Sequence, residues 1–288
     1  MSTFHRKKVS KLETASTMLA VMVLFAAMGQ VMGESPTVYF FSPETNINNF
    51  SSLKTEFDTY FGDKGKFQPF KGLKTFEKEI ADKKNGVFLV SSWHYQKLRR
   101  ENMELVAEGK KPKVEMAPAL VGLLKNQITQ RRIFSSKKKI ASLASLKGKK
   151  IASAGTKEYT KQVLAEMLGA DNRAIVDSFK ILTVPKDIDA LMAVSFGMAK
   201  AAITTEASVT KLSKVNKKLH GSLKTLAASE GTLLPIIAVP AGATKSTEEL
   251  LDVLLMMGMD SDGRKRLKMI GLEGWKTLTE DEKRRLDR

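Results

Sequence analysis

The turn at residues 153–159 carries the side chains best suited to bind an anion. Ser153, Gly155, Thr156 and Tyr159 follow a short strand-like run and open an amphipathic helical pattern. Backbone N–H groups at a helix start attract an anion, hydroxyls add donors, and glycine lets a ligand approach the backbone. In a second interpretation, Thr156 is simply the N-cap of the helix that it begins. The pattern predicts either an oxyanion site or an ordinary capped helix.

A second group of polar side chains follows the buried-type strand predicted at 87–90. Ser91, Ser92, Trp93, His94 and Tyr95 come directly after it, in what we interpret as a loop. Open α/β sheets bind ligands beyond the carboxyl ends of their strands. We therefore expect Ser92, His94 and Tyr95 to contact a ligand. The alternative is that the two aromatic residues pack in a core and that His94 lies on the surface.

Two further candidates stand at equivalent positions after other predicted strands. Ser42 follows the strand predicted at 37–41, and Glu206 follows the small-residue strand predicted at 199–204. A hydroxyl at the first position could donate to an anion, and the carboxylate at the second could accept from an ammonium or a protonated oxygen. Glu206 could equally be a solvent-facing carboxylate near a helix start.

The sequence offers little support for catalysis. It contains no Gly-x-Ser-x-Gly elbow, no His-Glu-x-x-His and no Walker loop. Cysteine is absent and the three histidines are scattered, so no metal-ligand spacing occurs. We expect a binding protein without enzymatic activity, catalytic residues, metal or cofactor.

Residues 1–33 have the pattern of an export signal. A basic start is followed by an uncharged apolar run at 18–28 and by small residues before a cleavage point at Gly33–Glu34. The run is well short of the roughly 20 residues that span a membrane. We predict a periplasmic protein, and the absence of cysteine removes the acceptor for a lipid anchor. The alternative is an uncleaved N-terminal anchor.

The chain is strongly basic, with a net charge of +17. The first 33 residues hold four basic residues and one acid, which leaves +14 on the rest. Such an excess favours a small oxyanion, an anionic membrane surface or nucleic acid as partner. Export argues against nucleic acid. Much of the charge lies in short clusters, which we interpret mainly as solvated helix ends and loops.

Strand-like and helical patterns alternate from residue 37 onward. Short β-prone runs occur near 37–41, 66–70, 87–90, 117–124, 151–153, 179–184, 199–204 and 236–239, with helical spacings between most of them. Strands separated by helices of 10–15 residues are typical of βαβ units with parallel sheets. Two such sets predict two α/β lobes.

Four motifs in order carry a resemblance to a known family. They are Ser-Ser-Trp-His-Tyr at 91–95, Leu-Lys-Gly-Lys-Lys-Ile-Ala at 146–152, Asp-Ala-Leu-x-Ala-Val at 189–194, and Asp-x-x-Gly-x-x-x-Leu-x-x-x-Gly-Leu at 260–272. With these motifs the chain resembles the phosphate/phosphite/phosphonate-type substrate-binding proteins of ABC transporters.

The resemblance implies the type 2 periplasmic-binding-protein architecture, in which two Rossmann-like α/β lobes are joined by a two-strand hinge. It places lobe 1 at 34–122 and 240–288, and lobe 2 at 123–239, after the signal at 1–33. It implies capture of a small oxyanion in the cleft between the lobes and delivery to an ABC permease in the inner membrane. In the family, the turn that corresponds to 153–159 grips the oxyanion.

The sequence departs from the family at one position of the expected site. Relatives carry a Ser-His-Asp-like turn before the Asp-Ala-Leu helix, whereas this chain has Val184-Pro185-Lys186-Asp187. Lys186 could supply a positive charge, but its ammonium is a flexible point charge and not an imidazole donor. The sequence therefore leaves three alternatives for this site: phosphonate, another oxyanion, or no ligand.

Two other functions stay open at this point. One is a sensory or scaffold module of the same fold, which would signal to a receptor and not to a transporter. The other is a basic protein that binds an anionic membrane surface.

Overall fold

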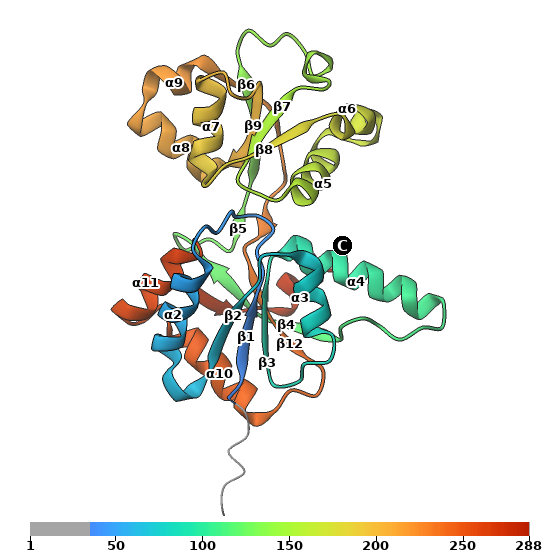
Figure 1. Ribbon diagram of the computed structural model, residues 1–288, viewed down its shortest axis with the longest axis vertical. Helices are drawn as coiled ribbons and strands as arrows, with labels where there is room; N and C mark the ends of the chain where they lie inside the picture. The colour runs from blue at the N-terminus through green and yellow to red at the C-terminus, as the bar shows by residue number, and fades with distance from the viewer. Residues whose placement is uncertain (1–34, 288) are drawn as a thin grey trace, which may run out of the picture. The chain divides into compact units, whose positions relative to one another are not determined.

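The computed structural model describes residues 35–287, which form one compact unit. The predicted export signal lies outside the described residues. Two mixed sheets with helices against them build this unit, as Figure 1 shows. The prediction of two α/β lobes is confirmed. In the described part of the chain, no helix combines the length and the apolar character needed to cross a membrane.

The first lobe is built on a six-stranded sheet with the order β13-β4-β12-β3-β1-β2. Its strands are β1 (Thr37–Phe40), β2 (Lys66–Pro69), β3 (Gly86–Val90), β4 (Met116–Leu123), β12 (Ile236–Pro240) and β13 (Gly274–Thr277). Its helices are α2 (Phe50–Phe61), α3 (Leu73–Ile80), α4 (Ser92–Ala107), α10 (Lys245–Met256), α11 (Ser261–Met269) and α12 (Glu280–Arg285).

The second lobe is built on a five-stranded sheet with the order β10-β6-β9-β7-β8. Its strands are β6 (Arg132–Lys137), β7 (Lys150–Ser153), β8 (Lys180–Thr183), β9 (Ala201–Thr205) and β10 (Leu223–Ala228). Its helices are α5 (Lys157–Leu168), α6 (Arg173–Asp177), α7 (Asp187–Ser195), α8 (Glu206–Val215) and α9 (Lys217–Ser222).

The chain passes between the lobes twice. On these passages β5 (Thr129–Gln130) and β11 (Thr232–Leu233) pair antiparallel as a two-stranded sheet. Strand β12 then pairs with β3 and β4 in the first sheet, so the second passage reaches the first lobe before Ile236.

The prediction of parallel sheets is correct for only part of each sheet. The β2-β1-β3 and β9-β7-β8 neighbours are parallel, whereas β12, β4, β13, β6 and β10 pair antiparallel. The departures are strands that carry the chain into or out of a lobe, or that enter from its C-terminal segment. Strands β6, β12 and β13 run opposite to the parallel strands of their sheets. Strands β4 and β10 follow helices and run with the parallel strands, and they pair antiparallel because their neighbours are reversed.

The loop predicted at 91–95 is a helix start. Ser91 is the N-cap of α4, and its hydroxyl accepts a hydrogen bond from the backbone N–H of His94. The motif therefore satisfies the free N–H groups of its own helix.

Aromatic packing holds the first lobe together. Val38, Phe67, Phe76 and Phe88 are fully buried in its core, and the ring of Phe67 stacks on Phe57 with centroids 4.3 Å apart. The second lobe has two smaller cores, one on each side of its sheet, which contain Leu164 and Leu191 respectively.

We expect Phe67→Ala to lower the free energy of unfolding by about 3–5 kcal/mol, because it deletes a fully buried ring and leaves a cavity. Phe196→Ala is the matched control, since that ring is 71% exposed and its loss should change stability by less than about 0.5 kcal/mol. Urea unfolding followed by circular dichroism measures both. Equal effects of the two variants would contradict this account of the core.

Candidate functional site

The carboxyl ends of the parallel strands in the two sheets position the candidate site. The loop after β1, residues 42–49, extends toward the second lobe, where β7, β8 and β9 end and β6 begins. The ends of α/β strands are where such sheets place ligands. The site is therefore assembled from segments that lie far apart in the sequence.

A buried arginine stands at the centre of this region. Arg132, the first residue of β6, is 7% exposed, and its Nη2 donates to Glu44 Oε2 at 2.9 Å. Its Nη1 donates to Asp187 Oδ1 at 3.3 Å, and its guanidinium lies over the ring of Tyr159. Glu44 comes from the first lobe, whereas the other three residues belong to the second. The ion pair therefore links the two lobes.

Burial and charge set the protonation of this cluster. Burial raises the pKa of Glu44 and of Asp187, although the neighbouring Arg132 acts in the opposite direction. Burial also raises the pKa of the Tyr159 hydroxyl. For Arg132, burial favours the neutral form, but Tyr159, Asp187 and Glu44 outweigh it and raise the pKa. The guanidinium is a permanent cation with two carboxylate partners.

A backbone contact joins the same two segments. The N–H of Thr156 donates to the carbonyl of Pro43 at 2.7 Å. A Cβ atom on Gly155 would meet Tyr159 Cδ1 at 2.6 Å and the Pro43 carbonyl at 3.1 Å. Glycine is therefore required here for the close approach of a loop of the protein itself. The sequence had suggested the approach of a ligand.

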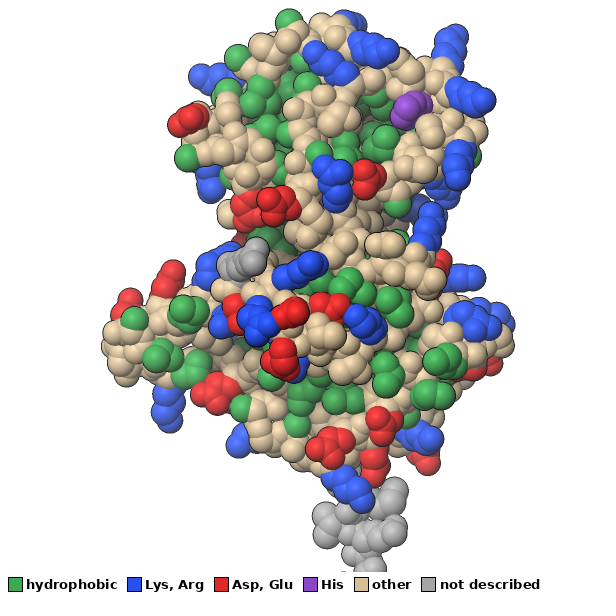
Figure 2. All heavy atoms as spheres, turned by 180° about the vertical axis from the view of Figure 1, so that it is seen from behind, with side chains coloured by type: hydrophobic (Ala, Val, Ile, Leu, Met, Phe, Trp, Pro, Cys, Tyr) green, Lys and Arg blue, Asp and Glu red, His purple; other side chains and the backbone are tan. Residues whose placement is uncertain are grey.

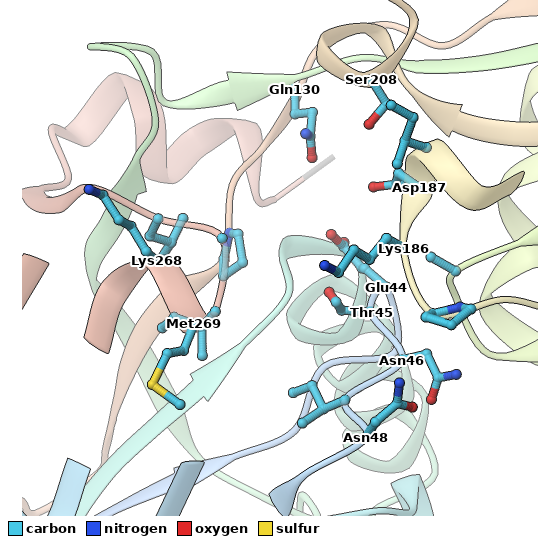
Figure 3. A pocket seen from close by; sticks show the side chains of 18 of the residues that line it. Glu44, Thr45, Asn46, Asn48, Gln130, Lys186, Asp187, Ser208, Lys268 and Met269 are labelled. Atoms are coloured by element: carbon cyan, nitrogen blue, oxygen red, sulfur yellow. The ribbon is translucent and has the colours of Figure 1, made fainter. Parts of the chain in front are cut away.

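The larger cavity in this region has a volume of about 550 Å³ and draws residues from both lobes. Figure 3 shows Lys186 and Asp187 on one side of it and Lys268 and Met269 on the other. Polar lining residues include Glu44, Asn46, Asn48, Gln130, Arg132, Lys186, Asp187, Ser208, Lys211 and Lys268. The cavity is lined by four cationic and two anionic side chains.

A smaller cavity of about 360 Å³ lies on the other side of the same loop. Residues 45–48 and Ala154 line both cavities, so the loop separates them. Ser42, Gly155, Thr156 and aromatic residues line the smaller one.

The predicted turn at 153–159 lies at this cleft, and its polar groups have partners within the protein. Ser153 Oγ accepts from the N–H of Gly155 and from the hydroxyl of Thr160. The hydroxyl of Thr156 accepts from the N–H of Tyr159 as the N-cap of α5, so the capping interpretation describes the observed geometry. A ligand role for this turn stays a prediction.

The other predicted residues lie in different places. Lys186 lines the larger cavity and Ser42 the smaller one, where the Ser42 hydroxyl donates to Thr45. Glu206 begins α8 and lies 3.6 Å from Arg131 in an exposed ion pair. It is not among the residues that line either cavity. Of these three, Lys186 is the best placed to meet a solute.

The predicted residues of α4 lie within the first lobe. Ser92 Oγ donates to the carbonyl of Leu233 at 2.7 Å, and the ring of Tyr95 is buried in the core. His94 is fully buried, and its Nε2 lies 3.0 Å from Glu77 Oε1. None of the three lines either cleft cavity. Their neighbour Trp93 does reach the second lobe, where its ring meets Tyr159 edge to face.

Sequence reasoning missed Arg132, Lys211 and Lys268. Arg132 stands in a run of mixed polar and apolar residues with no motif around it. Lys211 and Lys268 are on helices, and in the sequence they are indistinguishable from solvated surface lysines. No local signal identifies them, because tertiary contacts alone bring them to the cleft.

Comparison with known proteins places the chain in a family. A family model described as ABC transporter, phosphonate, periplasmic substrate-binding protein matches residues 37–283. The chain belongs to this family. Its members are non-enzymatic binding proteins of the periplasm, and membership implies a solute and a transporter permease as partners. A comparison with curated protein sequences gave no match.

Solved structures of periplasmic binding proteins share the fold. A protein of Xanthomonas citri, solved with bound ATP, has a TM-score of 0.59 at 13% identity and covers 88% of this chain and 95% of its own. The binding component of a Pseudomonas aeruginosa ABC phosphonate transporter has a TM-score of 0.57 at 14% sequence identity, and the match covers 88% of this chain and 86% of that protein. PhnD1 of Prochlorococcus marinus, solved with methylphosphonate, has a TM-score of 0.54 at 12% sequence identity, and the match covers 88% of this chain and 96% of that protein. These matches confirm the type 2 periplasmic-binding-protein fold.

Replacing the central arginine should leave two half-buried carboxylates without their counter-ion. We expect Arg132→Met to lower the free energy of unfolding by about 3–5 kcal/mol, because Glu44 and Asp187 lose their counter-ion. Arg131→Met is the matched control. Its exposed pair with Glu206 should contribute no more than about 1 kcal/mol. Chemical unfolding measures the free energy of unfolding of both variants. Similar losses in the two would refute the role of Arg132 as the counter-ion of both carboxylates.

The hydrogen-bonded pair of the buried His94 and the half-buried Glu77 should make the free energy of unfolding depend on pH in the acid range. Burial alone would raise the pKa of Glu77, but hydrogen bonds from His94 and Lys97 outweigh it and lower the pKa to about 2. Burial lowers the pKa of His94, so the neutral ring donates through Nε2. The contribution of the Glu77 carboxylate is complete above its ordinary pKa of 4.5 and is lost as pH falls toward 2.

We therefore expect Glu77→Gln to be less stable than the native protein at pH 7, with a difference that shrinks below pH 4.5. Glu79→Gln is the control, because it removes an exposed carboxylate of the same helix whose pair with Lys83 should contribute no more than about 1 kcal/mol. Unfolding curves between neutral pH and pH 3 test this. A difference for Glu77→Gln that stays constant over the range would contradict it.

Proposed function

We propose that the protein captures a small oxyanion of the phosphate, phosphite or phosphonate type in the larger cleft cavity and delivers it to an ABC permease. Family membership carries the transport role. The observation that carries the chemistry of the solute is a set of three lysines around one cavity. Lys186, Lys211 and Lys268 all line it, and no described carboxylate forms an ion pair with any of them.

The three lysines belong to different lobes, which supports a cleft that closes on its solute. Lys186 and Lys211 belong to the second lobe, whereas Lys268 stands near the end of α11 in the first lobe. An anion between them would interact with both lobes at once, and ligand contacts from both sides favour the closed form. Figure 3 shows Lys186 and Lys268 on opposite sides of the cavity.

Neutral donors and a helix start add to the site. The amides of Asn46, Asn48 and Gln130 and the hydroxyl of Ser208 line the same cavity. Helix α7 begins there at Asp187, and the positive end of its dipole favours an anion. Arg132 adds little to the net attraction, since both of its partners are carboxylates.

The cavity has room for more than a bare tetrahedral anion. Its volume of about 550 Å³ lies within the range of pockets that hold small organic ligands. Apolar residues at Ile47, Leu234 and Met269 line part of its wall. An oxyanion that carries an organic substituent therefore fits both the charges and the wall, and the relative solved with methylphosphonate offers one such probe.

Thermal unfolding of ligand-free protein with phosphate, phosphite, methylphosphonate, sulfate and acetate tests the proposal. A phosphorus oxyanion at 100 times its Kd should stabilise the protein by about 2.7 kcal/mol. We expect Lys186→Met and Lys268→Met each to weaken binding by about tenfold or more, because each removes a charge-assisted contact. Calorimetric titration measures the affinities.

Lys180→Met is the matched control, because that exposed lysine begins β8 and does not line the larger cavity. It should bind as the native protein does. The proposal fails if none of the phosphorus oxyanions binds, or if the two cavity variants bind as tightly as the control.

A further inference from the structure

The positive charge of the protein is concentrated on its second lobe. Residues 131–228 contain 19 Lys and Arg against seven Asp and Glu, a net charge of +12. The remaining described residues contain 24 Lys and Arg against 22 Asp and Glu, a net charge of +2. The first lobe is therefore nearly balanced in charge. A basic composition of the whole chain does not explain the difference in net charge between the lobes.

Strand directions gather most of these lysines at one edge of the second sheet. Strands β7, β8 and β9 run parallel and begin there, the antiparallel β6 ends there, and β10 begins there. Six lysines lie within residues 137–150 and four within 214–224, and Lys180 and Lys200 stand at the starts of β8 and β9. We call these twelve residues the lysine edge.

The lysine edge lies opposite the cleft. The cleft residues follow the carboxyl ends of β7, β8 and β9, whereas the lysine edge lies at their amino ends. These twelve lysines are therefore not part of the solute cavity; none of them lines it.

The lysine edge is mostly exposed to solvent, and its lysines have no carboxylate partner in the described part of the chain. Ten of its lysines are exposed, and Lys137 and Lys224 are half-buried. No ion pair between described residues involves any of the twelve, whereas many lysines of the first lobe are paired. Of the nearby acids, Asp177 pairs with Arg173.

Exposed apolar side chains stand among these lysines. Phe196 is 71% exposed and Met198 57%, on the turn that connects α7 to β9 directly before Lys200. Lys137 Nζ donates to the carbonyl of Ser195 and so lies beside this turn. Val215, 66% exposed, ends α8 among the lysines at 214–218.

We propose that the lysine edge docks on the surface of an anionic phospholipid bilayer, with Phe196 and Met198 inserted at the headgroup level. Clustered lysines bind anionic headgroups, and apolar side chains between them gain from entering the interface. A polyanion without apolar groups matches the charge and offers nothing to the apolar turn. Figure 2 shows Lys and Arg side chains around the upper end of the molecule with few acids between them.

This arrangement would leave solute capture unobstructed. The docked edge and the cleft are at opposite ends of the same strands, so a protein bound to the membrane surface keeps its cavity open to solvent. Docking of the lysine edge does not depend on which solute the cavity takes.

Vesicle co-sedimentation tests the proposal. The protein used begins at Glu34, because the apolar run at 18–28 would itself enter a bilayer, and residues 35–287 form a compact unit with their own cores. We expect binding to vesicles of phosphatidylglycerol mixed with phosphatidylcholine, no binding to phosphatidylcholine alone, and loss of binding as salt rises.

Two variants test the two parts of the surface. K138E/K139E/K147E/K149E should weaken binding by about 100-fold or more, and F196S/M198S by about threefold or more. K74E/K78E/K84E/K111E is the matched control, since it makes the same change in net charge at four exposed, unpaired lysines of the first lobe. It should bind within about threefold of the native protein.

Circular dichroism and thermal unfolding establish that each variant is folded, and F196S/M198S tests the surface without altering its charge. Equal loss in the two charge variants would overturn the proposal, because it would show attraction by net charge alone. Absence of binding to anionic vesicles at low salt would also overturn it. The proposal would likewise be overturned if the protein bound only to its permease, in detergent without lipid.

Discussion

A buried cation is central to the contact between the two lobes. Arg132 holds Glu44 of the first lobe and Asp187 of the second, and removing its charge would leave two carboxylates without a counter-ion in a poorly solvated place. The loop at 42–49 is held at the cleft by this pair and by the Pro43 carbonyl. Because that loop separates the two cavities, the ion pair also determines the shape of the space open to a solute.

The second lobe uses the two edges of one sheet for different chemistry. At the carboxyl edge, Glu44 and Asp187, which is in the first turn of α7, neutralise the buried Arg132 beside the lysines of the cavity. At the amino edge, twelve lysines have no carboxylate partner among the described residues. Parallel strands make this separation possible, since each connection returns the chain to the same edge. Solute recognition and surface attraction can therefore coexist without interfering.

Much of the architecture could be predicted because its signals are local. The cap at Thr156, the buried strand at 87–90 and the Gly169 helix end are readable from a few adjacent residues. The prediction erred at 91–95, where a polar motif after a strand was interpreted as a ligand loop and is a capped helix start. A ligand-binding loop and a capped helix start use the same residue types, because a serine hydroxyl can bind a ligand or cap its own helix. Strands β6 and β10 were missed because their residues lack a continuous apolar run.

The sequence by itself determined the alternation of strands and helices, the absence of metal and catalytic motifs, and the excess of lysine between 131 and 228. These properties follow from residue type and near-neighbour spacing, which need no knowledge of distant contacts. Only the tertiary structure decided that residues 44, 132 and 187 meet, that His94 belongs to a core, and that the lysines divide between a cavity and the opposite edge. The reason is that burial and ion pairing depend on neighbours far along the chain, and strand direction alone determines which of them share an edge.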